Sequence, residues 1–181
     1  MSHKLWSGKT ETGKSTVAKI MSAEAVKIKR PVLVYDIELS KWPEGVNVTD
    51  DPDLFLDVFW RTQDALAFID ESGESVGRNS EEFLFTATRG RKGGSEMNYL
   101  VQDPMLIDPQ IRRQCTMLLL FKTSATGCKA LADEFTCPEA LKASGFMPGR
   151  FIFRDDTGDV TKHYRCDFAT KKIYTVGPNE R

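Results

Sequence analysis

Short apolar runs alternate along the chain with longer stretches in which apolar positions recur every three or four residues. The short runs are typical of strands buried on both faces of a sheet, and the longer stretches are typical of amphipathic helices. The predicted strands are Lys4–Ser7, Val32–Asp36, Ala65–Glu71, Met97–Gln102 and Thr116–Phe121. The first is short and polar, which favours an edge or frayed strand.

Helices are predicted between these strands. The predicted helices are one from Val17 to about Ile28, one that begins after the cap at Asp51, Ser80–Thr88, and a short one that begins at Asp108. Strands that alternate with helices predict a parallel sheet with helices on both faces. The expected fold class is therefore a three-layer α/β/α fold with a mainly parallel sheet.

The pattern changes after about residue 124. One or two helices are expected between Lys129 and Ser144, and two short strands follow, Arg150–Arg154 and Val160–Arg165. A turn-rich stretch of Asp, Thr and Gly joins these strands, as in a β-hairpin. We expect this C-terminal β-hairpin to extend or cover one edge of the sheet.

Composition limits the domain organisation and the partners. A chain of 181 residues with 40% hydrophobic content can bury one substantial core. We expect a single domain over 1–181, with a core at about 4–123 and C-terminal helices and hairpin at about 124–175. The formal net charge of -1 gives no overall field for nucleic acid, so a polyanion contact requires a local patch or an assembly of copies. No apolar run is long enough to span a bilayer, which favours a soluble, cytoplasmic protein with no transmembrane segment.

The strongest chemical motif follows the first predicted strand. Its sequence, GKTETGKST, fits the phosphate-binding pattern G-x-x-x-x-G-K-[ST]. Glycines let the backbone wrap so that N–H groups point at phosphate oxygens, and the helix that begins here adds its positive dipole end. Lys14 reaches the β and γ phosphates, and the Ser15 hydroxyl can ligate Mg²⁺. The predicted nucleotide-binding residues are Gly8, Lys9, Thr10, Glu11, Thr12, Gly13, Lys14, Ser15 and Thr16.

Two later strands are predicted to end in catalytic groups. Ala65–Glu71 ends in adjacent carboxylates, the Walker B pattern. Asp70 can hold Mg²⁺ through water, and Glu71 is placed to orient or deprotonate the attacking water. Gln102 ends the next strand, and its amide can hydrogen-bond that water or the γ phosphate. Together with Lys14, these residues predict hydrolysis of a nucleoside triphosphate.

An arginine-rich turn, Arg89-Gly90-Arg91-Lys92, follows the helix Ser80–Thr88. For most helices such a turn is a solvated cap. Here it lies between the acidic pair and the next strand, so Arg89 or Arg91 is a candidate to stabilise a γ phosphate. The arginine can act in its own subunit or across an interface, and an exposed turn favours the interface.

The order of these features resembles the additional-strand ATPases and, among them, the FtsK/HerA superfamily, which includes viral genome-packaging ATPases and Zot-like phage proteins. The resemblance covers roughly Leu5 to Phe168. Its more particular part is the Thr88-Arg89-Gly90-Arg91 turn before Gln102. The histidine that relatives often carry beside the arginine is missing here, so the resemblance leaves open which arginine is the finger.

The resemblance implies a P-loop NTPase with strand order 5-1-4-3-2, counting the five core strands along the chain. ATP and Mg²⁺ would be the cofactors, with ATP at the carboxyl ends of strands one and three, and active forms would be homo-oligomeric rings, usually hexamers. Small viral packaging ATPases are of similar size, whereas Zot-like relatives carry a transmembrane segment. This favours a DNA-packaging motor that acts on double-stranded DNA in the host cell cytoplasm, with a capsid or portal protein as partner and association with the virion during assembly.

Two other functions stay open. One is a Zot-like, ATP-dependent assembly or extrusion factor that remodels protein. The other is a small-molecule kinase, since many kinases of this length begin with a phosphate loop. The Asp-Glu pair and the lack of an arginine-rich lid argue against the kinase. In a motor, DNA contacts would come from Arg89–Lys92 or Lys162–Arg165.

Overall fold

The computed structural model describes residues 2–71 and 80–180, except the side chains of Ser80, Arg91 and Lys92. Its strands are β1 (His3–Ser7), β2 (Val32–Tyr35), β3 (Asn47–Thr49), β4 (Leu66–Ile69), β5 (Glu96–Val101), β6 (Cys115–Leu120), β7 (Arg150–Asp155), β8 (Val160–Asp167) and β9 (Lys172–Val176). Its helices are α1 (Lys14–Lys27), α2 (Pro52–Arg61), α4 (Ser80–Arg89), α5 (Pro109–Gln114) and α6 (Ala125–Glu134), with 3-10 helices η2 (Gly90–Gly93) and η3 (Pro138–Gly145).

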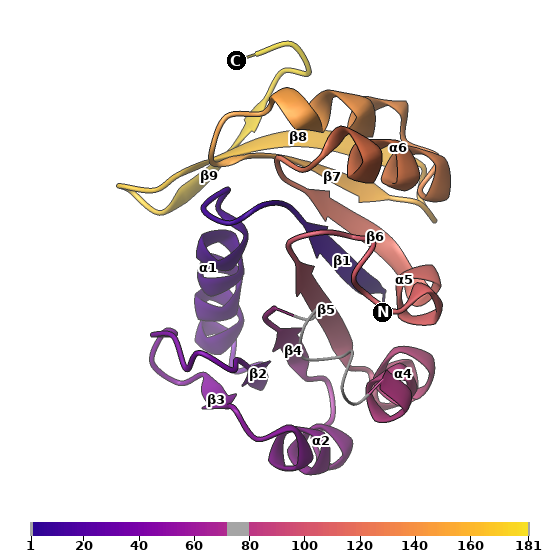
Figure 1. The fold of residues 1–181 in the computed structure, drawn as a ribbon. Helices are drawn as coiled ribbons and strands as arrows, with labels where there is room; N and C mark the ends of the chain where they lie inside the picture. The colour runs from indigo at the N-terminus through magenta and orange to yellow at the C-terminus, as the bar shows by residue number, and fades with distance from the viewer. Residues whose placement is uncertain (1, 72–79, 181) are drawn as a thin grey trace.

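The strands form one mixed sheet with the order β3-β2-β4-β5-β1-β6-β7-β8-β9 (Figure 1). The six strands from β3 to β6 in this order are parallel to their neighbours. Within them, the five strands predicted from the sequence lie in the predicted order 5-1-4-3-2. The strands β7, β8 and β9 form an antiparallel meander that continues the sheet beyond β6, so the expected hairpin extends the sheet and gains a third strand.

Helices cover both faces of the sheet, as predicted. On one face, α1 and the segment that carries Trp42 pack on apolar side chains that include Trp6 and Phe68. On the other face, α2, α4, α5, α6 and η3 pack over a larger core, to which Phe55 and Phe83 contribute. In Figure 1, α1 lies on one side of the strands, and α4, α5 and α6 lie on the other. No helix of the described ranges is long and apolar enough to cross a membrane.

The expectation of an edge position for the first strand is wrong, because β1 lies between β5 and β6. All five of its side chains are buried, and the side chains of His3, Lys4 and Trp6 have polar partners on β5. Lys4 forms an ion pair with Glu96, and the Trp6 indole donates to Asn98 at 3.1 Å. These contacts let polar side chains lie inside the sheet, and among the described residues the Ser7 hydroxyl is left without a hydrogen-bond partner.

Candidate nucleotide-binding site

The candidate site lies at the carboxyl ends of the parallel strands β1, β4 and β5. The phosphate loop follows β1, Asp70 and Glu71 follow β4, and Gln102 follows β5. Since β5 pairs with both β1 and β4, their carboxyl ends are adjacent. The fold therefore brings together three segments that are far apart in the sequence.

The phosphate loop is anchored at its start by two backbone hydrogen bonds. The Gly8 N–H donates to Val101 at 3.1 Å, and the Lys9 N–H donates to Lys122 at 2.8 Å. Gly8 has no room for a side chain, because an added Cβ would lie 2.6 Å from the Phe121 Cβ. At the end of the loop, Gly13 has φ 109°, a conformation that favours glycine. These constraints give the loop its wrapped shape.

Lys14 lies within the loop that precedes it. Its ammonium donates to the Gly8 carbonyl at 2.5 Å and to the Lys9 carbonyl at 3.2 Å. Burial lowers the pKa of Lys14, and the charges of Glu71 and Asp70 oppose this shift. The Thr12 hydroxyl also donates to Lys9, at 2.7 Å. Lys14 is thus a buried cation beside two carboxylates, in a loop whose residues Glu11 and Thr10 remain exposed.

Ser15 and Asp70 bring a hydroxyl and a carboxylate together at the start of α1. The Ser15 hydroxyl donates to Asp70 Oδ2 at 3.1 Å. Burial raises the pKa of the Asp70 carboxyl, and the charge of Asp36 adds to the effect. Within the described ranges, no three His, Cys, Asp or Glu side chains form a metal cluster. Mg²⁺ is commonly bound by one or two carboxylates together with substrate phosphates, so these two oxygen ligands fit it.

A hydrogen-bonded chain connects Gln102 to both the acidic pair and the loop. The Gln102 amide donates to Glu71 Oε2 at 2.9 Å, and its carbonyl oxygen accepts from the Thr10 hydroxyl at 3.1 Å. Glu71 has φ 51°, in the left-handed region that non-glycine residues rarely adopt. Such backbone conformations are common at functional sites.

Asp36, for which the sequence predicted no role, ends β2 next to Asp70. Burial disfavours the charge of Asp36, but hydrogen bonds from Ser40, Trp42 and Glu38 outweigh it and lower its pKa. The Asp36 carboxylate accepts from the Ser40 hydroxyl at 2.6 Å and from the Trp42 indole at 2.9 Å. Because its oxygens are occupied in this way, Asp36 orders the loop beside the site and is a poor candidate for a metal ligand.

The arginine turn lies at the amino ends of the parallel strands, whereas the phosphate loop lies at their carboxyl ends. Arg89 ends α4, and Gly93, which ends η2, accepts from the Asp64 N–H just before β4 at 3.0 Å. Both therefore lie where β4 and β5 begin. Arg89 is exposed and stacks on Phe85, with 4.4 Å from its Cζ to the ring centroid. This position places Arg89 away from the phosphate loop of its own chain, and action across an interface stays a prediction. The side chain of Arg91 lies outside those described.

The C-terminal meander contacts the phosphate loop, which the sequence did not indicate. The Gly149 N–H donates to the Thr12 carbonyl at 2.9 Å, and the Gly149 carbonyl accepts from the Cys166 N–H at 2.8 Å. Gly149 has φ 85°, and a Cβ added there would lie 2.5 Å from the Cys166 oxygen. The loop before β7 therefore contacts the phosphate loop directly, at a position with no room for a side chain.

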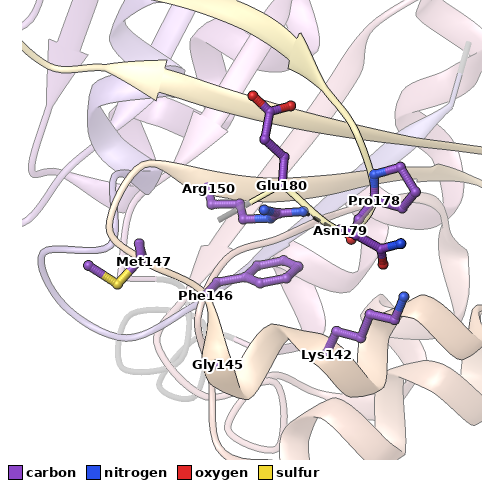
Figure 2. Close-up of a pocket in the computed structure, with 8 residues that line it drawn as sticks. All are labelled: Lys142, Gly145, Phe146, Met147, Arg150, Pro178, Asn179 and Glu180. Atoms are coloured by element: carbon purple, nitrogen blue, oxygen red, sulfur yellow. Dashed lines mark hydrogen bonds between the residues drawn. The ribbon is translucent and has the colours of Figure 1, made fainter.

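A hollow of about 530 Å³ lies between η3 and the C-terminal residues, separate from the phosphate loop (Figure 2). Arg150 lies in its wall, with its guanidinium over the Phe146 ring at 4.9 Å. The guanidinium donates to the carbonyls of Gly177 at 3.0 Å and Pro178 at 3.2 Å. Arg150 therefore fixes the end of the chain to the meander.

No protein-family profile and no curated protein sequence matches the chain. Solved structures match its fold. The genome packaging NTPase B204 from Sulfolobus turreted icosahedral virus 2, in complex with AMPPCP, gives a TM-score of 0.73 at 15% identity, over 90% of this chain and 96% of that chain. VirB4 of Thermoanaerobacter pseudethanolicus gives 0.71 at 10% identity, over 91% and 89%. The N-terminal domain of zonular occludens toxin from Neisseria meningitidis gives 0.52 at 14% identity, over 96% and 99%. The predicted P-loop NTPase fold, and the resemblance to packaging ATPases and Zot-like proteins, are confirmed at the level of the fold.

Proposed function

We propose that the chain hydrolyses ATP at the phosphate loop and couples hydrolysis to movement of nucleic acid, as a viral or phage DNA-packaging motor. The observation that carries the ATPase proposal is the convergence of two pairs on one loop: Ser15 with Asp70, and Gln102 with Glu71. The first pair suits a magnesium ion, and the second suits control of a water molecule. A loop that only bound nucleotide would not need the second pair.

Each residue of the site has a distinct part in the proposed reaction. Ser15 and Asp70 would hold Mg²⁺, which would supply positive charge to the phosphates of the bound nucleotide. Lys14 contributes a positive charge at the same phosphates, and the loop N–H groups bind their oxygens. Glu71 orients the attacking water and accepts its proton, while Gln102 holds the Glu71 carboxylate in place.

Translocation of double-stranded DNA is proposed from the similarity in fold to the genome packaging NTPase B204, at 15% identity. The active form would be a homo-oligomeric ring, most simply a hexamer, in the host cytoplasm, with a capsid or portal protein as partner and association with the virion during assembly. Since the net charge is -1, DNA contacts have to be concentrated on the ring channel. The exposed side chains of Lys162 and Arg165 on β8 are candidates, as is the arginine turn.

Turnover of ATP with and without long duplex DNA tests this function. We expect the wild-type rate to rise with DNA and the Glu71→Gln variant to stay slow under both conditions. A wild-type rate that does not respond to DNA would contradict the motor, and transfer of phosphate to an added small molecule would favour a kinase instead.

A second candidate is an ATP-dependent assembly or extrusion factor. The match to the N-terminal domain of zonular occludens toxin, over 96% of this chain, supports it. Such a factor would hydrolyse ATP with the same residues but act on protein. ATP turnover that is indifferent to DNA yet abolished by Glu71→Gln would favour this candidate over the packaging motor.

A further inference from the structure

A half-exposed aromatic ring lies against the phosphate loop. Phe168 belongs to the turn between β8 and β9, and 44% of it is exposed. A Cβ added to Gly13 would lie 3.0 Å from the Phe168 Cε1 atom, and one added to Gly149 would lie 3.3 Å from its Cζ atom. The edge of the ring therefore packs on two glycines, while part of its surface stays open to solvent.

The turn that carries this ring is held by hydrogen bonds. The Asp167 carboxylate accepts from the N–H groups of Ala169 at 2.8 Å and Thr170 at 3.1 Å, which shapes the turn around Phe168. Just before it, the Cys166 N–H donates to Gly149, and Gly149 donates to Thr12 of the phosphate loop. A ring held in this way is already ordered before a ligand arrives, which lowers the cost of binding.

Phe168 lies on the side of the loop away from the groups proposed to act on the γ phosphate. Asp70 and Gln102 follow β4 and β5, on one side of β1, whereas Phe168 follows β8, on the other side. A triphosphate whose γ end lies between Asp70 and Gln102 extends across the loop, so its nucleoside end leaves on the side of Phe168.

The surroundings of Phe168 offer room for a planar group. A hollow of about 460 Å³ is lined by Phe168 together with Pro148 and Tyr174, which is itself 47% exposed. The hollow next to Thr16 and Lys19 also contains an aromatic residue, Trp42. Trp42 is only 8% exposed, and its indole N–H is bonded to Asp36, so it offers little free ring surface.

From these contacts we propose that Phe168 is the platform on which the base of the bound nucleotide stacks. Aromatic rings bind bases through their faces, and every base has such a face. The Asp167 carboxylate is engaged in its own turn, so the site reads the base by stacking more than by hydrogen bonds to its edge. We therefore expect ATP and GTP to bind with similar affinity.

The inference rests on the proposed nucleotide site, and its test separates the two. Equilibrium binding of ATP and of inorganic tripolyphosphate, each with Mg²⁺, is measured for the wild type, Phe168→Ala, Phe168→Leu and Phe168→Trp. Phe168→Ala should weaken ATP roughly 5-fold to 100-fold, as expected for loss of one stacked base, and leave tripolyphosphate unchanged. Phe168→Trp should retain ATP affinity, and Phe168→Leu, which keeps apolar volume without a ring, should behave like Phe168→Ala.

Trp60→Ala is the matched control, because Trp60 on α2 is 47% exposed and lies outside the site. It should leave both affinities unchanged. Unchanged ATP affinity in Phe168→Ala overturns the inference, and so does an equal loss for both ligands, which would mean that the ring only supports the loop. Equal affinity of the wild type for the two ligands also overturns it, whereas a wild type that binds neither overturns the proposed function itself.

Discussion

Gln102 is predicted to act through Glu71 and not directly on the nucleotide. Its amide donates to Glu71 Oε2 at 2.9 Å, and its oxygen accepts from Thr10 at 3.1 Å. Replacing it in Gln102→Leu keeps a similar volume and removes both hydrogen bonds. A hydrogen bond to a charged group is worth about 1.5–3 kcal/mol. If this energy is lost only in the transition state, hydrolysis slows about 10-fold to 150-fold.

The assay is single-turnover hydrolysis of ATP with Mg²⁺ and protein in excess. Glu71→Gln should slow hydrolysis at least about 100-fold, as expected for loss of a general base. In a Glu71→Gln chain, the additional Gln102→Leu change should have little effect, because the carboxylate that Gln102 orients is already gone. Affinity for ATP should be the same in all three variants.

Gln110→Leu is the control, since Gln110 is an exposed glutamine at the start of α5, outside the site. It should hydrolyse ATP at the wild-type rate. Multiplicative effects of the Glu71 and Gln102 changes would refute the positioning role and mean that Gln102 contacts the water or the γ phosphate by itself. A normal rate in Gln102→Leu would refute any role.

Three further outcomes follow from the structure. Lys14→Ala should lose ATP binding without a change in the urea midpoint of unfolding, because Lys14 supplies charge and not core packing. Retained ATP affinity would contradict the phosphate-loop assignment. Asp36→Asn should destabilise the chain by about 2–3 kcal/mol at pH 7 in urea unfolding. Because the pKa of Asp36 is lower in the folded chain, its contribution is full above the unfolded value of about 3.9 and disappears as pH falls through the folded value, so the difference from wild type should shrink below about pH 4. Gly149→Ala should lower the free energy of unfolding in urea by about 1–3 kcal/mol, because the φ of Gly149 is 85° and the new Cβ would meet the Cys166 oxygen. A variant as stable as the wild type would contradict the described contact.

Much of the fold was predictable because apolar runs bounded by turn residues mark buried strands well. The strands β3 and β9 were missed because neither is a buried apolar run. β3 has three residues and no fully buried side chain, and β9 has only exposed and half-buried side chains and pairs with β8. Their pairing is decided by neighbours that a local pattern does not contain.

The candidate site was predictable where chemistry follows strand ends. The loop, the acidic pair and Gln102 converge because the carboxyl ends of neighbouring parallel strands lie side by side. The sequence left open whether Arg89 acts in its own subunit or across an interface, because sequence order does not say at which end of the strands a helix ends. The contacts of Gly149 and Phe168 with the loop join segments about 135 to 155 residues apart, a relation that no spacing in the sequence expresses.

The central claim is a ring motor, and such a ring implies that the arginine turn of one subunit completes the hydrolysis site of its neighbour. One mixing experiment tests this most directly. Lys14→Ala lacks a working loop but keeps the arginine turn, and a double variant with Arg89→Ala and Arg91→Ala keeps the loop but lacks the turn. A turn that acts across an interface contributes on the order of 10³-fold or more in rate. Each variant alone should therefore be nearly inactive, and an equimolar mixture should regain a measurable rate of ATP turnover. A double variant as active as the wild type, or a mixture as inactive as its parts, would contradict the account.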